Sequence, residues 1–142
     1  GTGAIGVFLA PRVKNVIGFE VIDSAVKDAE RNASLNRRGN TRFIKMDMKD
    51  ALQDSGKTIS RYGLPDTVIL DPPRGGPHPK TVRGLLRLGA PRIIYVSCNP
   101  SMLARDLAVL CESRYSLIAV QPVDMFPHTA HIETVVRLDL VQ

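Results

Sequence analysis

The chain has 142 residues, with 19 basic and 14 acidic side chains and a formal net charge of +5. This length is enough for one domain with a hydrophobic core, and no apolar run approaches the roughly 20 residues that a membrane span needs. Two cysteines do not make a disulfide framework, which predicts a cytoplasmic protein. The basic excess is compatible with an anionic partner such as RNA, although many solvated surfaces have the same balance.

Strand and helix patterns alternate along most of the chain. The sequence predicts helices over 4–10, 24–38, 49–62, 80–88 and 101–112, and strands over 15–21, 42–46, 67–70, 93–96, 117–123 and 133–140. Ser24 and Ser101 are expected to cap two of the helices. Pro11 is expected to stop the first helix, and Gly39-Asn40 the second. The elements predict an α/β, Rossmann-like fold in one domain over 1–142, with a mostly parallel, doubly wound sheet and a C-terminal antiparallel hairpin.

A glycine-rich turn opens the chain. Gly1, Gly3 and Gly6 give the spacing Gly-x-Gly-x-x-Gly, which lets the backbone approach a ligand closely where a helix begins. Such turns normally follow a strand, so we expect the first, central strand of the sheet to be missing from this chain. The motif fits a nicotinamide dinucleotide as well as S-adenosylmethionine, and a tight turn without a ligand is the structural alternative.

Acidic residues follow three of the predicted strands. Glu20 is suitably placed for ribose hydroxyls, and Asp47 for adenine or ribose, with a helix cap as the alternative role of Asp47. Asp71 begins Asp71-Pro72-Pro73-Arg74, where two prolines can neither continue a strand nor begin an ordinary helix. This segment predicts a stiff loop at the carboxyl edge of the sheet, with a rigid turn as the alternative.

Cys98 follows a buried strand, and Asn99-Pro100 then breaks that strand. Open α/β sheets bind ligands at this end of their strands, and a thiolate there is a strong nucleophile. The alternative is a small buried hydrophobic residue, the structural role that we predict for Cys111. Glu133 lies beside apolar residues that could raise its proton affinity and make it a base, and an exposed carboxylate is its alternative. The sequence predicts no metal site.

Three segments together resemble the RNA uracil-5-methyltransferase family, whose members use S-adenosylmethionine to make 5-methyluridine in transfer and ribosomal RNA. The segments are Asp71-Pro72-Pro73-Arg74-Gly75-Gly76, Ile93-Ile94-Tyr95-Val96-Ser97-Cys98-Asn99-Pro100 and Met125-Phe126-Pro127-His128-Thr129-Ala130-His131-Ile132-Glu133. The form of the third segment is more similar to the branch that modifies 23S ribosomal RNA than to the transfer RNA branch.

The resemblance implies a class I methyltransferase catalytic domain with Cys98 as nucleophile and Glu133 as base. It implies S-adenosylmethionine as cofactor, held by Gly1, Thr2, Gly3, Gly6, Glu20, Asp47 and Asp71. Arg74, Asn99 and His128 are expected to orient the uracil or a phosphate. A thiolate that adds to uracil C6 makes C5 nucleophilic, and a base must later remove the C5 proton. The target base must leave its stack, so RNA loops are the expected substrates.

Two departures from the family pattern accompany the resemblance. Met102 stands where the family usually has Thr, which removes a hydroxyl near a helix cap. Family members also carry an RNA-binding domain and a central segment, in some with an iron–sulfur cluster, ahead of the matching part. We therefore expect this chain to be the catalytic domain of a longer enzyme.

Several other functions stay open at this point. An RNA cytosine-5 methyltransferase would place a cysteine in the Asp71 loop, where this chain has none. An exocyclic-amine methyltransferase would not need Cys98 or Glu133. A non-catalytic cofactor- or RNA-binding fragment is also possible, and a nicotinamide oxidoreductase accounts only for the glycine turn.

Overall fold

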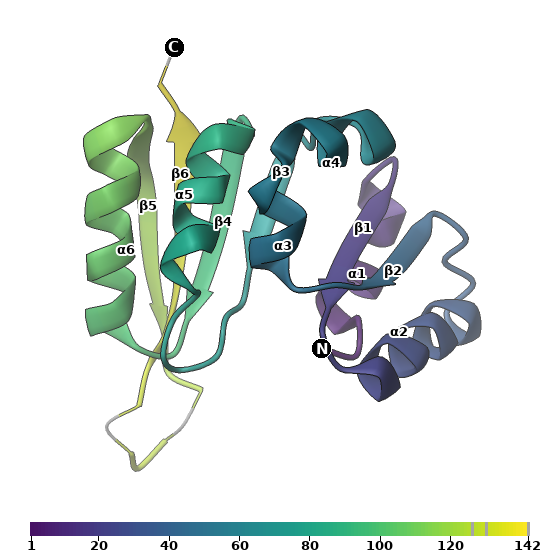
Figure 1. The fold of residues 1–142 in the computed structure, drawn as a ribbon. Coiled ribbons are helices and arrows are strands. Elements are labelled where there is room, and N and C mark those ends of the chain that lie inside the picture. Colours follow the sequence, from purple (N-terminus) through teal and green to yellow (C-terminus); the bar gives the residue numbers. More distant parts are fainter. Residues whose placement is uncertain (126, 130, 142) are drawn as a thin grey trace. The chain divides into compact units, whose positions relative to one another are not determined.

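The computed structural model describes residues 1–125, 127–129 and 131–141 (Figure 1). The chain divides into two compact units, Gly1–Ala51 (unit 1) and Leu52–Gln142 (unit 2). No helix in the described part of the chain is long and apolar enough to cross a membrane. The prediction of one catalytic domain over residues 1–142 stays a prediction.

Unit 1 is a small parallel sheet with helices. Its two strands pair in parallel, with Val16 opposite Thr41 and Glu20 opposite Lys45. Its elements are α1 (Ala4–Leu9), the 3₁₀ helix η1 (Ala10–Arg12), β1 (Val16–Glu20), α2 (Asp23–Leu35) and β2 (Thr41–Lys45), and α3 (Met48–Gln53) begins at its end.

Glycines let the elements of unit 1 close around the ring of Phe43. A Cβ atom on Gly3 would lie 2.8 Å from both the Phe43 ring and the Ala29 side chain. A Cβ atom on Gly18, directly opposite Phe43 in the sheet, would lie 2.6 Å from the same ring. Gly3 also has a φ of 79°, which L side chains rarely adopt. Gly3 is therefore required for packing, whether or not a ligand also approaches this turn.

Unit 2 contains a four-stranded mixed sheet in the order β3-β4-β6-β5. β3 and β4 are parallel, whereas β6 runs antiparallel to both β4 and β5, so the predicted C-terminal hairpin is confirmed. The elements are α4 (Ser55–Tyr62), β3 (Thr67–Leu70), α5 (Pro79–Leu88), β4 (Arg92–Ser97), α6 (Pro100–Ser113), β5 (Tyr115–Val123) and β6 (Glu133–Leu140). Figure 1 shows α5 and α6 side by side along this sheet.

One face of the unit 2 sheet is its core face. In β4 every second residue is buried, namely Ile93, Tyr95 and Ser97, as expected from strand geometry. The hydroxyl of Tyr95 donates a 2.7 Å hydrogen bond to the buried carboxylate of Asp106 on α6. This face of the sheet therefore packs against α6, and the intervening residues of β4 are half-buried on the opposite face.

Several predicted helix ends were wrong. α2 has Ile22 at its N-cap without a side-chain bond, so Ser24 lies inside the helix rather than capping it. The helix ends at Leu35, because Arg37 rather than Gly39 takes the left-handed conformation, with a φ of 55°. The predicted stop at Pro11 is confirmed, since α1 ends at Leu9, and Pro11 itself lies in the first turn of the 3₁₀ helix η1.

Two further helix boundaries also differ from the prediction. The helix predicted over 49–62 is two helices, because Asp54 interrupts it and caps α4 by accepting from the Lys57 backbone amide at 3.1 Å. Asn99 rather than Ser101 caps α6. At α6 the capping acceptor thus lies two residues before the predicted one.

Candidate active site

Cys98 and Glu133 lie at the same end of the neighbouring strands β4 and β6. β4 and β6 are antiparallel, and Ser97 opposite Thr134 is the last pair of their ladder. Cys98 follows Ser97 and Glu133 precedes Thr134, so the two stand opposite each other one step beyond the ladder. Ser97 and Thr134 are buried, whereas Cys98 and Glu133 are both half-buried. The register therefore places a residue with a thiol and a residue with a carboxylate at neighbouring backbone positions.

The loop that begins at Asp71 runs beside the Cys98 turn. β3 is parallel to β4, so its carboxyl end lies at the same edge of the sheet. The Nδ2 group of Asn99 donates a 3.1 Å hydrogen bond to the backbone carbonyl of Arg74. The loop closes on itself where the Gly76 amide donates to the Pro73 carbonyl at 2.8 Å. Asp71 itself is exposed.

Side-chain hydrogen bonds fix the backbone on both sides of Cys98. The buried Ser97 hydroxyl donates to the Asn99 carbonyl and accepts from the Asn99 amide, both at 3.1 Å. The Oδ1 atom of Asn99 accepts from the backbone amides of Ser101 at 3.1 Å and Met102 at 3.3 Å. Because Asn99 supplies this cap, the absence of a Thr hydroxyl at position 102 does not leave the first turn of α6 uncapped.

Arg74 and two histidines occupy the segments around this edge. The Arg74 guanidinium lies 3.3 Å from Nδ1 of His131, and the Thr129 hydroxyl accepts from the His131 amide at 3.2 Å. His128 is exposed and has a left-handed φ of 68°. We did not predict His131 as a site residue, and its place in the third family segment was the available signal. Two other residues of that segment, Phe126 and Ala130, lie outside the described residues.

Unit 1 gathers several of the residues predicted to bind the cofactor. Glu20 ends β1, and its carboxylate accepts from the amides of Val21 at 2.7 Å and Ile22 at 2.9 Å. The backbone nitrogen of Gly1 also contacts this carboxylate. Thr2 contributes its carbonyl to the Asn32 side chain at 3.0 Å. The glycine turn is therefore in contact with the carboxyl end of β1.

Asp47 lies near the same edge of the unit 1 sheet. The Met46 amide donates to the Glu20 carbonyl at 2.9 Å, and Asp47 is the next residue. One carboxylate oxygen of Asp47 accepts from the Lys49 amide at 2.9 Å, and the other pairs with the Lys49 ammonium at 2.7 Å. These contacts raise the pKa of Lys49. They are the bonds of a helix-start residue, and a contact of Asp47 with adenine or ribose stays a prediction.

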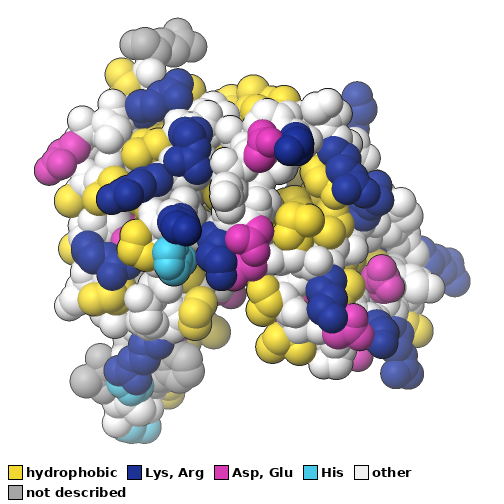
Figure 2. All heavy atoms as spheres, in the orientation of Figure 1, with side chains coloured by type: hydrophobic (Ala, Val, Ile, Leu, Met, Phe, Trp, Pro, Cys, Tyr) yellow, Lys and Arg dark blue, Asp and Glu magenta, His cyan; other side chains and the backbone are white. Residues whose placement is uncertain are grey.

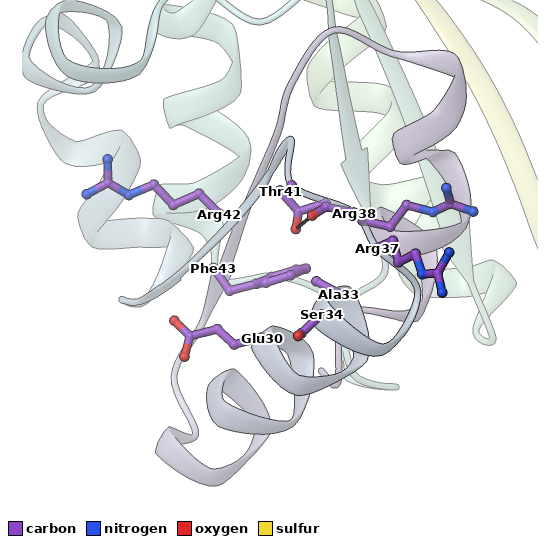
Figure 3. A pocket seen from close by; sticks show the side chains of 9 residues that line it. Glu30, Ala33, Ser34, Arg37, Arg38, Thr41, Arg42 and Phe43 are labelled. Atoms are coloured by element: carbon purple, nitrogen blue, oxygen red, sulfur yellow. Dashed lines mark hydrogen bonds between the residues drawn. The ribbon is translucent and has the colours of Figure 1, made fainter.

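A pocket of about 560 Å³ lies at the other end of unit 1 (Figure 3). It is formed where α2 ends and β2 begins, and contains none of the predicted site residues. Positive charge at the C-terminus of a helix complements the helix dipole, which accounts for arginines here without a ligand. The lining residues are Glu30, Ala33, Ser34, Arg37, Arg38, Gly39, Thr41, Arg42 and Phe43.

Cys111 does not have the core position expected of a structural cysteine. Its side chain is exposed on α6, whose buried residues are Leu103, Asp106 and Leu110. Among the described residues, no three His, Cys, Asp or Glu side chains form a group that could hold a metal ion. Of the two thiols, only Cys98 lies next to a carboxylate across the sheet ladder, that of Glu133, and Cys111 has no such position.

Unit 2 carries a basic surface on α5. Apart from Pro79, the exposed residues of this helix are all cationic, and the helix has no acidic residue. Figure 2 shows Lys and Arg side chains gathered over α5. We call the three cationic residues of α5 the α5 basic stripe: Lys80, Arg83 and Arg87.

The fold is that of the Rossmann-like methyltransferases. An rRNA methylase from Streptococcus thermophilus matches with a TM-score of 0.74 over 100% of this chain and 82% of that chain, at 16% sequence identity. The predicted fold class is therefore confirmed.

A family model, tRNA (uracil-5-)-methyltransferase, matches residues 1–141, and the chain belongs to this family. An uncharacterized RNA methyltransferase of Chlorobaculum tepidum is 49% identical over 137 residues, which cover 95% of this chain and 28% of that protein. The crystal structure of Pyrococcus abyssi tRNA (uracil-54, C5)-methyltransferase in complex with S-adenosyl-L-homocysteine has a TM-score of 0.81 and 37% identity, covering 97% of this chain and 32% of that one. The chain thus spans about three tenths of the length of its relatives.

Proposed function

We propose that the full-length protein transfers a methyl group from S-adenosylmethionine to C5 of a uridine in RNA. The observation that supports this most is the position of Cys98 opposite Glu133 at the edge of the unit 2 sheet, in a chain of the uracil-5 family. A cytosine-5 enzyme is a weaker alternative, because the loop beside Cys98 contains no second thiol.

Cys98 and Glu133 have complementary tasks in this reaction. The Cys98 sulfur forms a bond to uracil C6, and the electron pair of the C5–C6 double bond moves toward O4, which makes C5 nucleophilic. S-adenosylmethionine, when bound, supplies the electrophilic methyl group. Glu133 then takes the proton from C5, the double bond re-forms, and the bond between Cys98 and C6 breaks. Both side chains are half-buried, which suits a reaction in which the uracil ring must be held away from bulk water.

The residues of unit 1 fit the chemistry of an adenosine-containing cofactor. The Glu20 and Asp47 carboxylates offer acceptors for ribose hydroxyls and the adenine amino group, near the carboxyl ends of β1 and β2. We assign the cofactor to these two residues and to the turn made by Gly1, Thr2, Gly3 and Gly6, and a cofactor contact of Asp71 in unit 2 stays a separate prediction.

RNA is the proposed macromolecular partner, with ribosomal RNA as the first candidate substrate. The α5 basic stripe supports an anionic partner. Transfer RNA is the second candidate, because the Pyrococcus abyssi relative acts on it. We assign Arg74 and His128 to orienting the uracil or a phosphate, and a cytoplasmic location follows from this function.

Covalent trapping tests the proposal directly. RNA with 5-fluorouridine should form a stable adduct with the full-length protein, because fluorine at C5 cannot leave as a proton does. The adduct should map to Cys98 and be lost in Cys98→Ser, whereas Cys111→Ser, a change at the exposed thiol, should trap normally. Ribosomal and transfer RNA are assayed in parallel for methyl incorporation. A protein that methylates RNA without trapping, or a Cys98→Ser variant that still methylates, refutes the nucleophile.

Glu133→Gln separates the base from the nucleophile. The amide cannot accept the C5 proton, so the variant should form the adduct with unmodified RNA and release product slowly. We expect methyl transfer in the first turnover and a large loss in steady-state rate, on the order of 10²–10⁴-fold. Normal steady-state turnover would show that another group is the base.

A further inference from the structure

We propose that Asn99 is a positioning residue that fixes the Cys98 turn against the Asp71–Arg74 loop and does not contact the uridine. Its catalytic meaning rests on the proposed function, whereas its structural part can be tested without it. Asn99 was predicted from the sequence to orient the uracil or a phosphate, and its hydrogen bonds suggest this different role.

The contacts of the Asn99 side chain are made within the chain. Oδ1 accepts from the amides of Ser101 and Met102, which occupies both of its lone pairs. Nδ2 donates to the carbonyl of Arg74 at 3.1 Å. Three of the four hydrogen bonds that an Asn amide can make are therefore used by the two segments that it joins. A substrate contact through Oδ1 would require uncapping α6.

The bond from Nδ2 to Arg74 lies at the far end of the proline-stiffened loop. Pro72 and Pro73 restrict the backbone after Asp71, so one bond at Arg74 limits where the whole loop can lie relative to the Cys98 turn. The guanidinium of the same Arg74 contacts His131, from the segment that leads into Glu133. Asn99 thus links the loop after β3 to the turn after β4, and Arg74 extends the link to the segment before β6.

Cys98 is the residue whose position this link controls. Its neighbours Ser97 and Asn99 are joined by two 3.1 Å hydrogen bonds, so the turn moves as one piece. Addition of sulfur to C6 requires an approach of about 3–3.5 Å, and a displacement of about 1 Å can cost roughly 100-fold in rate. A loop held against this turn keeps a bound uracil and the Cys98 thiol in a fixed position relative to each other.

Two substitutions separate the cap from the link. Asn99→Ser keeps a side-chain oxygen that can cap α6 but cannot reach the Arg74 carbonyl, whereas Asn99→Ala removes both functions. With the full-length protein and 5-fluorouridine RNA, we expect adduct formation in Asn99→Ser to slow by about 10–100-fold. The KM for RNA should stay within about threefold, and the pH profile of Cys98 alkylation by iodoacetamide should be unchanged. A rise in KM with a normal adduct rate would identify a substrate contact and overturn the inference.

Hydrogen exchange tests the link without any activity. The loop 71–76 has four backbone amides, on Asp71, Arg74, Gly75 and Gly76, since its other two residues are prolines. In Asn99→Ser these amides should exchange about tenfold faster, while those of β6 keep their wild-type rates. Unchanged exchange in the loop overturns the inference. If the wild-type protein forms no adduct with either RNA, the proposed function fails, and exchange still decides the role of Asn99.

Discussion

The buried pair Tyr95–Asp106 gives a prediction whose size follows from the structure. Tyr95 is 0% exposed and donates its hydroxyl to Oδ2 of Asp106, which is 3% exposed. The other oxygen, Oδ1, pairs with Arg105 at 2.8 Å. In Tyr95→Phe the ring stays in place, but Oδ2 loses its hydroxyl donor. Because hydrogen bonds to a charged group contribute about 1.5–3 kcal/mol, we expect the free energy of unfolding to fall by about that amount.

Tyr115 provides the matched control. It is 1% exposed and donates its hydroxyl to the backbone carbonyl of Ala90 at 2.9 Å, so its acceptor is neutral. Tyr115→Phe should therefore cost only about 0.5–1.5 kcal/mol. Urea unfolding at pH 7, followed by circular dichroism, measures both variants against the wild type. A Tyr95→Phe variant no less stable than Tyr115→Phe would refute the reasoning.

The pH dependence of unfolding adds an independent check on the same pair. Burial first, and then the neighbouring Asp106 carboxylate, raise the pKa of Tyr95. A tyrosine whose pKa is raised on folding stabilises the folded state fully when the pH is below its pKa in the unfolded chain, about 10. This stabilisation is lost as the pH rises above that pKa. The stability advantage of the wild type over Tyr95→Phe should therefore narrow above about pH 10. A constant difference up to pH 11 would contradict the burial of this hydroxyl.

Three further predictions concern other parts of the chain. Gly3→Ala should destabilise unit 1 by about 2 kcal/mol or more in urea unfolding, because its Cβ would meet Phe43 and φ is positive, whereas Gly39→Ala, in open space, should be near neutral. Arg137, and then Arg92, lower the pKa of Asp139. The ionised carboxylate therefore stabilises the fold above about pH 4, and this stabilisation is lost as the pH falls below that value. In acid unfolding, the free energy of unfolding of Asp139→Asn should fall less steeply with decreasing pH than that of the wild type. Replacing the three cations of the α5 basic stripe with glutamines should weaken RNA binding. If all three contact phosphates, the slope of the logarithm of the RNA association constant against the logarithm of salt concentration should decrease in magnitude by about 2–3. An unchanged slope would exclude the stripe from the RNA interface.

The elements that depend on local pattern were predictable from the sequence. β3 was predicted residue for residue over Thr67–Leu70, because a short apolar run with an acid and two prolines after it leaves little choice of boundary. Helix ends were less predictable, because several nearby side chains can cap one turn. At α6 the cap is Asn99 rather than Ser101. Arg37 took the left-handed conformation in preference to a glycine two residues away.

The sequence by itself determined the family, through three segments whose residue types are rarely found together, and it selected Cys98, Glu133 and Asp71 as candidates. It did not determine that Cys98 lies next to Glu133 at the end of the β4–β6 ladder. That proximity arises because β6 inserts between β4 and β5 and runs antiparallel to β4, with Ser97 opposite Thr134. Strand order and register depend on which surfaces pack across the whole sheet, and no local pattern encodes them. For the same reason, only the tertiary structure revealed that the Asn99 side chain is engaged by the Arg74 carbonyl and the first turn of α6.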